Sequence, residues 1–391
     1  MMSKVSITGS LFLLASIGIA IAAGASFNAM HNPEPIYPGP GVSQSRPLSS
    51  YFGALTGTPG DTPVFILEGK EPGGTFVLLG GTHPQEVAGH VAATLVVENV
   101  QVKKGRLIVI PQANRSGFTY TEPLEGFPHT YDIDTPDGKR WFRFGMRLTN
   151  PVHQWPDPDV QTHNPSGEYM VGWEARNLNR NYPGRPDGRF TERVGHAITE
   201  VVKTENSMLV LDMHEAYPEY PIIDMIVAHQ RAFEIGTIAA LMLKSRGIPM
   251  DVLASPENLH GLSHREFGDH TPSFALLSET ASPAMGRFRG RTDQNLITHG
   301  QDKNYEIAHA LGRLFVPFGK EGHSLQHRVA RNMATIEEIV AAYNEGNKGN
   351  EIILEDLPSY NDIMKKGIGA FLRSSPEAEL SPGGKMSAAE R

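Results

Sequence analysis

The chain has 391 residues, of which 39% are hydrophobic, with a formal net charge of −8 at pH 7 and no cysteine. This length is enough for one sizeable α/β core and leaves room for a small second domain. Acidic and basic residues are scattered without a dense Lys/Arg stripe, which argues against nucleic acid as a partner. The lack of cysteine excludes disulfides and leaves His, Asp and Glu as metal ligands.

The first 25 residues are typical of an export signal. Lys4 precedes an apolar run from Ile7 to Ala23, and small residues with an A-x-A pattern follow at 23–25. The alternatives are an uncleaved membrane anchor, rather short because spanning a bilayer takes about 20 apolar residues, or a buried core helix. We expect an exported protein, periplasmic or extracellular, that contacts a membrane only if this segment is kept.

Residues 26–49 are rich in Pro, Gly, Ser and Asn without apolar periodicity, so we expect a linker there and a folded domain over 50–320. Within the domain, short apolar runs alternate with helix-like stretches, a pattern that predicts an α/β fold with a mostly parallel twisted sheet flanked by helices. The predicted strands are Pro63–Leu67, Thr75–Leu79, Arg106–Ile110, Met208–Met213, Ile222–Ala228 and Phe274–Ser278. The predicted helices are Glu86–Val100, Thr191–Thr204, His229–Arg246 and Gly300–Phe315.

Two segments depart from this rhythm. Residues 118–172 are dense in Pro, Asp, His and aromatics, and a long insertion without regular structure is usually a functional lid or a pocket wall. Residues 321–373 predict a helical C-terminal extension, with helices at Thr335–Tyr343 and Tyr360–Leu372. The polar residues 374–391 are expected to form a disordered tail.

Three predicted strands each deliver a chemically active residue at the carboxyl end. The strand at 75–79 leads through Gly80 and Gly81 to His83 and Glu86, the strand at 208–213 runs into His214, and the strand at 274–278 runs into Glu279. Open α/β sheets gather their ligand sites at this edge. Position thus adds weight to the His-x-x-Glu spacing, which by itself occurs in many helices by chance.

Two imidazoles and one carboxylate leave a fourth position for water, which is the arrangement of a catalytic zinc site. Zinc lowers the pKa of bound water to about 7, and a nearby carboxylate can take its proton. Glu279 is the candidate for this base. Glu215 is an alternative ligand to His214, and Asp212 either orients the ring of His214 or is a buried, hydrogen-bonded acid.

Four blocks resemble the succinylglutamate desuccinylase/aspartoacylase family, a branch of the zinc carboxypeptidase clan. The blocks are Gly80–Glu86, Arg176–Gly184, Pro183–Arg193 and Leu211–His214, in the family's order. The separation of 128 residues between Glu86 and His214 (214 − 86) is also of the size seen in the clan. The resemblance implies a zinc carboxypeptidase-like fold, Zn²⁺ bound by His83, Glu86 and His214, and Glu279 as general base and later proton donor.

The resemblance also implies substrate contacts. Asn179 and Arg180 would bind a substrate carboxylate, for which a guanidinium is well shaped, although they could also be a turn residue and a surface cation. An arginine commonly stabilises the oxyanion in the clan. Arg143 is the best positional match, with Arg147 and Arg176 as alternatives. Asn114 corresponds to a pocket-wall position or caps a turn.

Other features limit the resemblance. Many relatives carry a β-rich C-terminal domain that narrows the entrance, whereas the residues after Glu279 look helical, so the 118–172 insertion is the candidate wall. Its aromatics would favour a substrate with an apolar or ring-bearing part. His260, His264 and His270 crowd one loop, but their spacing fits no familiar zinc site and predicts pocket lining or surface.

The favoured function is hydrolysis of the amide bond of an N-acyl amino acid or a related substrate that bears a carboxylate. An exported carboxypeptidase that acts on short peptides would use the same zinc chemistry, and the motifs do not separate the two. A non-catalytic binding module is the third alternative. The two histidines, two glutamates and the Asn-Arg pair argue against it, because a decayed site should have lost at least one of them.

Overall fold

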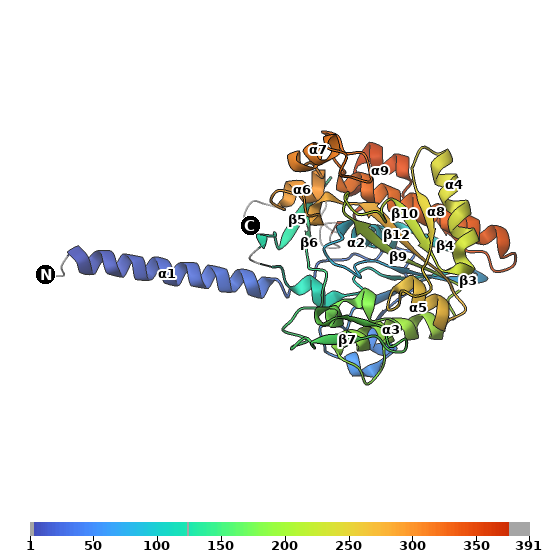
Figure 1. The fold of residues 1–391 in the computed structure, drawn as a ribbon, viewed down its shortest axis with the longest axis horizontal. Helices are drawn as coiled ribbons and strands as arrows, with labels where there is room; N and C mark the ends of the chain where they lie inside the picture. Colours follow the sequence, from blue (N-terminus) through green and yellow to red (C-terminus); the bar gives the residue numbers. More distant parts are fainter. Residues whose placement is uncertain (1–3, 123–124, 375–391) are drawn as a thin grey trace.

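A mixed sheet of nine strands forms the centre of the computed structural model, which describes residues 4–122 and 125–374 (Figure 1). Eight strands follow one another in the order β1-β2-β4-β3-β9-β12-β10-β11, and β13 pairs with β4. Their bounds are β1 Gln44–Pro47, β2 Pro63–Glu68, β3 Glu71–Leu79, β4 Gln101–Ile110, β9 Leu209–Ala216, β10 Met225–Ala228, β11 Asp251–Ala254, β12 Phe274–Ala281 and β13 Ile353–Glu355.

The centre of the sheet is parallel. Strands β4, β3, β9 and β12 pair in parallel, as do β10 and β11, whereas β1 with β2, β2 with β4, β10 with β12 and β13 with β4 are antiparallel. All eight residues of β9 are buried, as expected for a strand covered on both faces. The predicted α/β class is confirmed, with the parallel pairings concentrated where the site residues emerge.

Helices cover both faces of the sheet. Alternate residues of β3 point to opposite sides: Phe76 and Leu78 pack with α2, α4 and α8, while Val77 and Leu79 pack with α3. Helix α8 contacts both α2 and α4, and Figure 1 shows it beside α4. The helix bounds are α2 Val87–Asn99, α3 Phe190–Thr204, α4 Phe233–Ser245, α5 Ser263–His270, α6 Gln294–His299, α7 Lys303–Ala310, α8 Leu325–Gly346 and α9 Tyr360–Lys366.

Of the stretch 300–315, predicted to be one helix, only α7 at Lys303–Ala310 is helical. Gly300 has a φ of +67° and ends α6, and the side chain of Asp302 caps α7, which ends at Ala310. A left-handed glycine after a helix and a carboxylate before the next one are ordinary stop and start signals. The apolar periodicity used for the prediction did not take these two signals into account.

The 118–172 insertion is more ordered than its composition predicts. It forms two hairpins, β5 Thr130–Thr135 with β6 Gly138–Arg143 and β7 Val160–Thr162 with β8 Tyr169–Val171. Tyr131, Phe142 and Phe144 are buried in the same core as α2. Part of the segment expected to form a lid or pocket wall therefore belongs to the hydrophobic core.

The segment 321–373 is also built into the core rather than appended to it. Val329, Met333, Ile336 and Ile339 of α8 are fully or almost fully buried in the same cluster as α2 and α4. The three residues of β13 then join the sheet beside β4. The expected disordered tail lies, apart from Ser374, outside the described residues.

The N-terminal helix α1 (Lys4–Ala29) extends away from the domain (Figure 1). Its residues Ile7–Ala29 have a mean hydropathy of 2.0 and none of the most apolar stretch is buried, so α1 could cross a membrane by length and composition, a test that signal sequences also pass. The expected linker 26–49 is partly built into the domain. Met30 and Glu34 are buried, and β1 pairs with β2.

Candidate metal centre

The ends of β3, β9 and β12 bring four site residues together. After β3, a turn with Gly81 at φ +64° leads to His83, and a Cβ on Gly81 would lie 2.8 Å from the Phe118 ring, so this tight turn requires glycine. Glu86 follows immediately before α2. In the register of the parallel strands His214 lies beside Glu279. All four lie at the carboxyl edge of the sheet.

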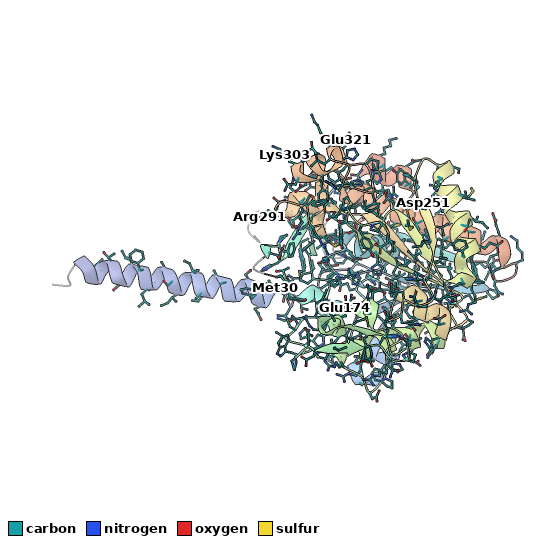
Figure 2. All side chains as sticks on the ribbon, viewed as in Figure 1. Met30, Glu174, Asp251, Arg291, Lys303 and Glu321 are labelled. Carbon is teal, nitrogen blue, oxygen red and sulfur yellow. The ribbon has the colours of Figure 1, made fainter. Side chains whose placement is uncertain are left out.

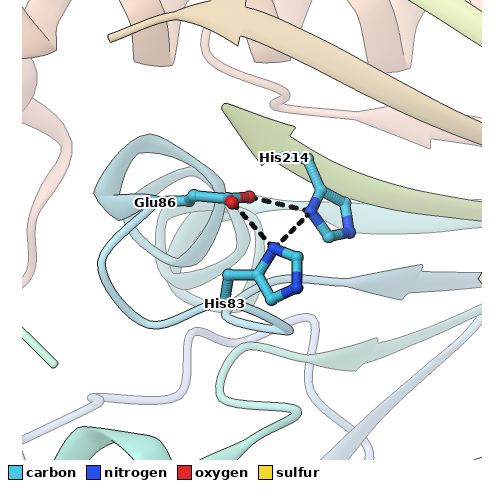
Figure 3. Close-up of side chains that lie close together, drawn as sticks. All are labelled: His83, Glu86 and His214. Atoms are coloured by element: carbon cyan, nitrogen blue, oxygen red, sulfur yellow. Dashed lines mark hydrogen bonds and ion pairs between the residues drawn. The ribbon is translucent and has the colours of Figure 1, made fainter. Parts of the chain in front are cut away.

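His83, Glu86 and His214 form one buried cluster (Figure 3). The two carboxylate oxygens of Glu86 lie 2.7 Å from Nδ1 of His83 and 2.8 Å from Nδ1 of His214. The two Nδ1 atoms are 3.1 Å apart. Only one of the two Nδ1 atoms can donate a proton to the other. The two Nδ1 atoms and the Glu86 carboxylate are thus three close donor atoms around one point.

This donor set fits a divalent cation. Zinc bonds of about 2.0–2.1 Å in a tetrahedron place neighbouring ligand atoms roughly 3.3 Å apart. The separations of 2.7 to 3.1 Å are only slightly smaller. His83, Glu86 and His214 could therefore hold a metal ion such as zinc through Nδ1, Nδ1 and the carboxylate, with room for a further ligand.

A second side chain orients each imidazole. Nε2 of His214 lies 2.9 Å from Oδ2 of Asp212, whose other oxygen accepts a hydrogen bond from Thr82. Nε2 of His83 lies 2.9 Å from Oδ1 of Asn177, and the amide of Asn177 donates to Glu174. Such partners fix the ring and its tautomer. Sequence reasoning identified Asp212 but missed Asn177, although it lies within the matched block 176–184.

Burial and neighbouring charges act differently on the three side chains of the cluster. Burial lowers the pKa of His83 to about 4, and the positive charge of Arg147 adds to this effect, so the ring is neutral at pH 7. Burial raises the pKa of Glu86, but His83 and His214 outweigh it and hold that pKa well below its usual range. Burial lowers the pKa of His214, but Asp212 and Glu86 raise it well above normal.

Glu279 has the properties of a proton-transfer group. Burial, followed by the negative charge of Glu86, raises its pKa to about 8. Its Oε2 atom has no hydrogen-bond partner among the described residues. A carboxyl group that titrates near neutral pH and keeps a free oxygen beside the metal ligands can both take and give a proton.

Glu215, the alternative metal ligand to His214, has other partners for both of its carboxylate oxygens. Its Oε1 forms an ion pair with Arg328 in which both side chains are fully buried, and its Oε2 accepts a hydrogen bond from the Ala88 backbone. Its backbone N–H, rather than its carboxylate, faces Glu86. The geometry therefore favours His214 as the ligand.

The structure places Arg147, and not Arg143, at the cluster. Arg147 Nη1 donates to Glu86 at 3.0 Å and lies 3.2 Å from Nδ1 of His83. The guanidinium of Arg143 donates instead to the backbone carbonyls of Ala29 and Asn32, which corrects the expectation for Arg143. The third candidate, Arg176, is held by the Asp157 carboxylate and the carbonyl of Thr149.

Asn179 and Arg180 lie in the turn Leu178–Arg180. The Asn179 side chain accepts a hydrogen bond from the Ser263 backbone, and Arg180 donates to the carbonyl of Asn179 at 2.8 Å. Burial, with the charge of Arg147 next, lowers the pKa of Arg180. Among the described residues Arg180 has no ion pair with a carboxylate, and Glu174 and Glu168, which raise its pKa, act from a distance. Asn114 caps the turn that begins at Arg115.

The histidines before β12 do not form an open ligand set. His163, His260 and Glu266 lie close together, but Nε2 of His163 faces the Tyr182 carbonyl at 2.6 Å and Glu266 accepts from the Gly261 backbone at 2.8 Å. His264 is buried. His270 lies 3.1 Å from Glu266. His163, His260, Glu266 and His270 thus form a polar network beside the loop, whereas neither ring nitrogen of His264 has a hydrogen-bond partner among the described residues.

Two cavities lie away from the metal cluster. One of about 370 Å³ is lined by Glu34, Arg46 and neighbours, and one of about 390 Å³ by His31, His153 and neighbours. Asp61 and Arg115 contribute to both. None of the four residues His83, Glu86, His214 and Glu279 lines either cavity.

No protein-family model matches the chain. Over 172 residues it is 27% identical to an N-alpha-acetyl-L-2,4-diaminobutyric acid deacetylase of Halomonas elongata, an alignment that covers 43% of this chain and 35% of the deacetylase. The similarity agrees with the resemblance to the succinylglutamate desuccinylase/aspartoacylase family. The chain thus matches only about a third of the length of this curated relative.

Solved structures with similar folds include a succinylglutamate desuccinylase/aspartoacylase and a metallo-carboxypeptidase. A succinylglutamate desuccinylase/aspartoacylase from Rhodobacter sphaeroides is 21% identical with a TM-score of 0.33, covering 56% of this chain and 51% of that one. A metallo-carboxypeptidase from Burkholderia cenocepacia is 12% identical with a TM-score of 0.40, covering 76% and 68%.

Proposed function

We propose that this chain is a zinc-dependent hydrolase that cleaves the amide bond of an N-acyl amino acid or a related substrate with a carboxylate. One observation carries the proposal: the Nδ1 atoms of His83 and His214 and the carboxylate of Glu86 converge, with Glu279 in the adjacent strand position. The similarity to a deacetylase of an N-acetylated amino acid supports the choice of an acyl amide.

Zinc, when bound, would polarise the scissile carbonyl and lower the pKa of a bound water. Glu279, with a pKa raised to about 8 by burial and by Glu86, would move a proton at its free Oε2 atom, taking it from the attacking water and giving it to the leaving amine. Arg147 faces the cluster and is the donor for the negative charge that develops on the carbonyl oxygen. Asp212 and Asn177 hold the imidazoles still.

Substrate recognition falls to Asn179 and Arg180. Among the described residues the Arg180 guanidinium donates to the backbone carbonyl of Asn179, and a substrate carboxylate would complete its hydrogen bonding. A carboxypeptidase would use the same guanidinium for a peptide C-terminus, and this is the alternative function. The partner in either case is a small molecule or short peptide. The apolar helix α1 supports a location outside the cytoplasm.

The test combines metal analysis with hydrolysis assays on purified full-length protein. We expect one tightly bound zinc per chain, loss of activity with a chelator, and faster cleavage of N-acyl amino acids than of short peptides. Glu279→Gln should retain the zinc and lower kcat by about 10²–10⁴-fold. Protein without stoichiometric zinc, or unchanged kcat in Glu279→Gln, would contradict the mechanism. Preference for peptides would favour the carboxypeptidase.

A further inference from the structure

We propose that α1 stays attached as a membrane anchor, and that the loop carrying Val152 and Trp155 at its base rests on the surface of the lipid bilayer. This inference concerns a surface remote from the chemistry and is independent of the proposed function. It rests on the exposure of α1, on how firmly its end is joined to the domain, and on what surrounds that junction.

Helix α1 exposes apolar side chains in every direction. Leu11, Phe12, Leu13 and Leu14 are consecutive and each is at least 62% exposed, and they cover more than one full turn of the helix. A protein partner would cover one stripe of such a helix, whereas lipid covers all sides. At 1.5 Å per residue, 23 residues extend about 35 Å, enough for a hydrocarbon core of about 30 Å.

The end of α1 is fastened to the domain without a flexible linker. The Arg143 guanidinium donates to the carbonyls of Ala29 and Asn32, which satisfies acceptors that a helix end leaves unpaired. The backbone N–H of Arg143 donates to the buried carboxylate of Glu34 at 2.8 Å. Met30, which Figure 2 labels at the junction, is 4% exposed. The direction of the helix therefore fixes the face of the domain that meets the bilayer.

Two loops of the 118–172 insertion surround this junction. Ser26 lies 3.4 Å from Nδ1 of His129, and the ring of Phe27 packs on the same imidazole. On the other loop, the ring of His153 packs against His31. Residues adjacent to these contacts therefore lie at the level where the helix would enter the membrane.

The loop of His153 carries two apolar side chains that are mostly exposed to solvent. Val152 is 85% exposed and Trp155 is 71% exposed. Tryptophan is enriched where the hydrocarbon meets the headgroups, because its ring is apolar and its N–H can bond to polar groups. The bilayer that receives α1 is the occupant that can cover both side chains, since the same helix fixes their height.

The absence of cysteine makes a direct test possible. Full-length protein is reconstituted into liposomes of phosphatidylcholine and phosphatidylglycerol after Val152→Cys or Trp155→Cys and labelling with an environment-sensitive fluorophore. Leu241→Cys is the matched control, because Leu241 is 61% exposed on α4, which Figure 1 shows on the side of the domain opposite to α1. Quenching by lipids with a nitroxide near the headgroup is then measured.

We expect blue-shifted emission and at least two-fold stronger quenching at positions 152 and 155 than at 241, with the intact N-terminus found by mass spectrometry in the membrane fraction. Quenching at 152 and 155 equal to that at 241 would overturn the contact of the loop with the bilayer. A mature protein that begins near Ala25 and is released from membranes would overturn the anchor. Neither outcome bears on hydrolysis, so the two proposals fail separately.

Discussion

At the scale of single residues, the cluster of His83, Glu86 and His214 depends on side chains that lie outside it. Asp212 and Asn177 each hold the Nε2 atom of one imidazole, and so they turn the Nδ1 atoms toward Glu86. The two partners differ in charge, because Asp212 is a carboxylate and Asn177 a neutral amide. His83 is therefore oriented without gaining the positive character that Asp212 confers on His214.

Asn177→Ala should weaken zinc binding by about 10–100-fold, because the ring of His83 loses the acceptor that orients it. Competition with a chromophoric chelator measures this affinity. Asn177→Asp keeps an acceptor at the same place and should retain most of it. If Asn177→Ala binds zinc as tightly as the unmodified chain, the orienting role is wrong.

Arg147→Gln should lower kcat by about 10²–10³-fold with little change in zinc content, since the lost guanidinium would serve the developing oxyanion. Arg143→Gln is the matched comparison, and its kcat should stay within a few-fold of normal because Arg143 bonds to the N-terminal segment. Steady-state kinetics on one N-acyl amino acid separates them. A larger loss in Arg143→Gln would reverse the assignment.

Sequence reasoning predicted the grouping of His83, Glu86, His214 and Asp212, but neither Asn177 nor the position of Arg147, for a physical reason. His83, His214 and Glu279 each follow an apolar strand, so topology alone brings them to one edge. Arg143 and Arg147 lie four residues apart on a segment that passes from a strand into irregular backbone, and spacing does not tell which way either side chain turns. The groups that bind Arg143 belong to residues 26–49, which carry no periodic pattern.

At the scale of elements, the turn that carries Arg180 is held by the loop before α5. Ser263 donates to Asn179, and the Tyr182 backbone donates to the carbonyl of Gly261. Gly261 lies directly on the turn, because a Cβ there would come within 2.4 Å of the Arg180 carbonyl oxygen. Glu266 fixes the Gly261 N–H in turn. The position of the guanidinium thus depends on a neighbouring element.

Gly261→Ala should raise KM for a carboxylate-bearing substrate about 10-fold while zinc content stays unchanged, since the added methyl group displaces Arg180. Gly247→Ala is a close control: φ is +80° at Gly261 and +76° at Gly247, but nothing lies within 4 Å of a Cβ at Gly247. Both variants carry similar backbone strain, and only the first has the clash. Equal KM values in the two variants would remove the loop from substrate positioning.

The elements that sequence reasoning found are the ones with strong apolar runs. Strands β2, β4, β9 and β12 begin or end within a few residues of the predicted ranges, because buried central strands must be apolar. Strand β1 has four exposed residues, and β13 has three residues of which only one is partly buried, so neither carries an alternating pattern. Edge strands of this kind are recognised from their pairing partners, which only the fold reveals.

At the scale of the whole molecule, one buried ion pair links the C-terminal third to the metal centre. Arg328 on α8 pairs with Glu215, which directly follows His214, and it also donates to Ser282 after β12 and to the carbonyl of Ile297 on α6. Arg328 lies in the first turn of α8, and its fully buried side chain ties this helix to the strands beside it. The helix predicted within the C-terminal extension is therefore a layer of the core.

Arg328→Met should lower the free energy of unfolding by about 3–5 kcal/mol, because it leaves the Glu215 carboxylate buried without its partner. Arg328→Met combined with Glu215→Gln should recover part of this loss, since no buried charge then remains unpaired. Arg246→Met removes a more exposed pair with Glu337 and Glu338 and should cost about 1 kcal/mol or less. Denaturant unfolding of the full chain measures all three. If the double variant were less stable than Arg328→Met alone, desolvation of Glu215 could not be the cause, and the loss would have to come from the packing of α8 against the strands that carry the metal ligands.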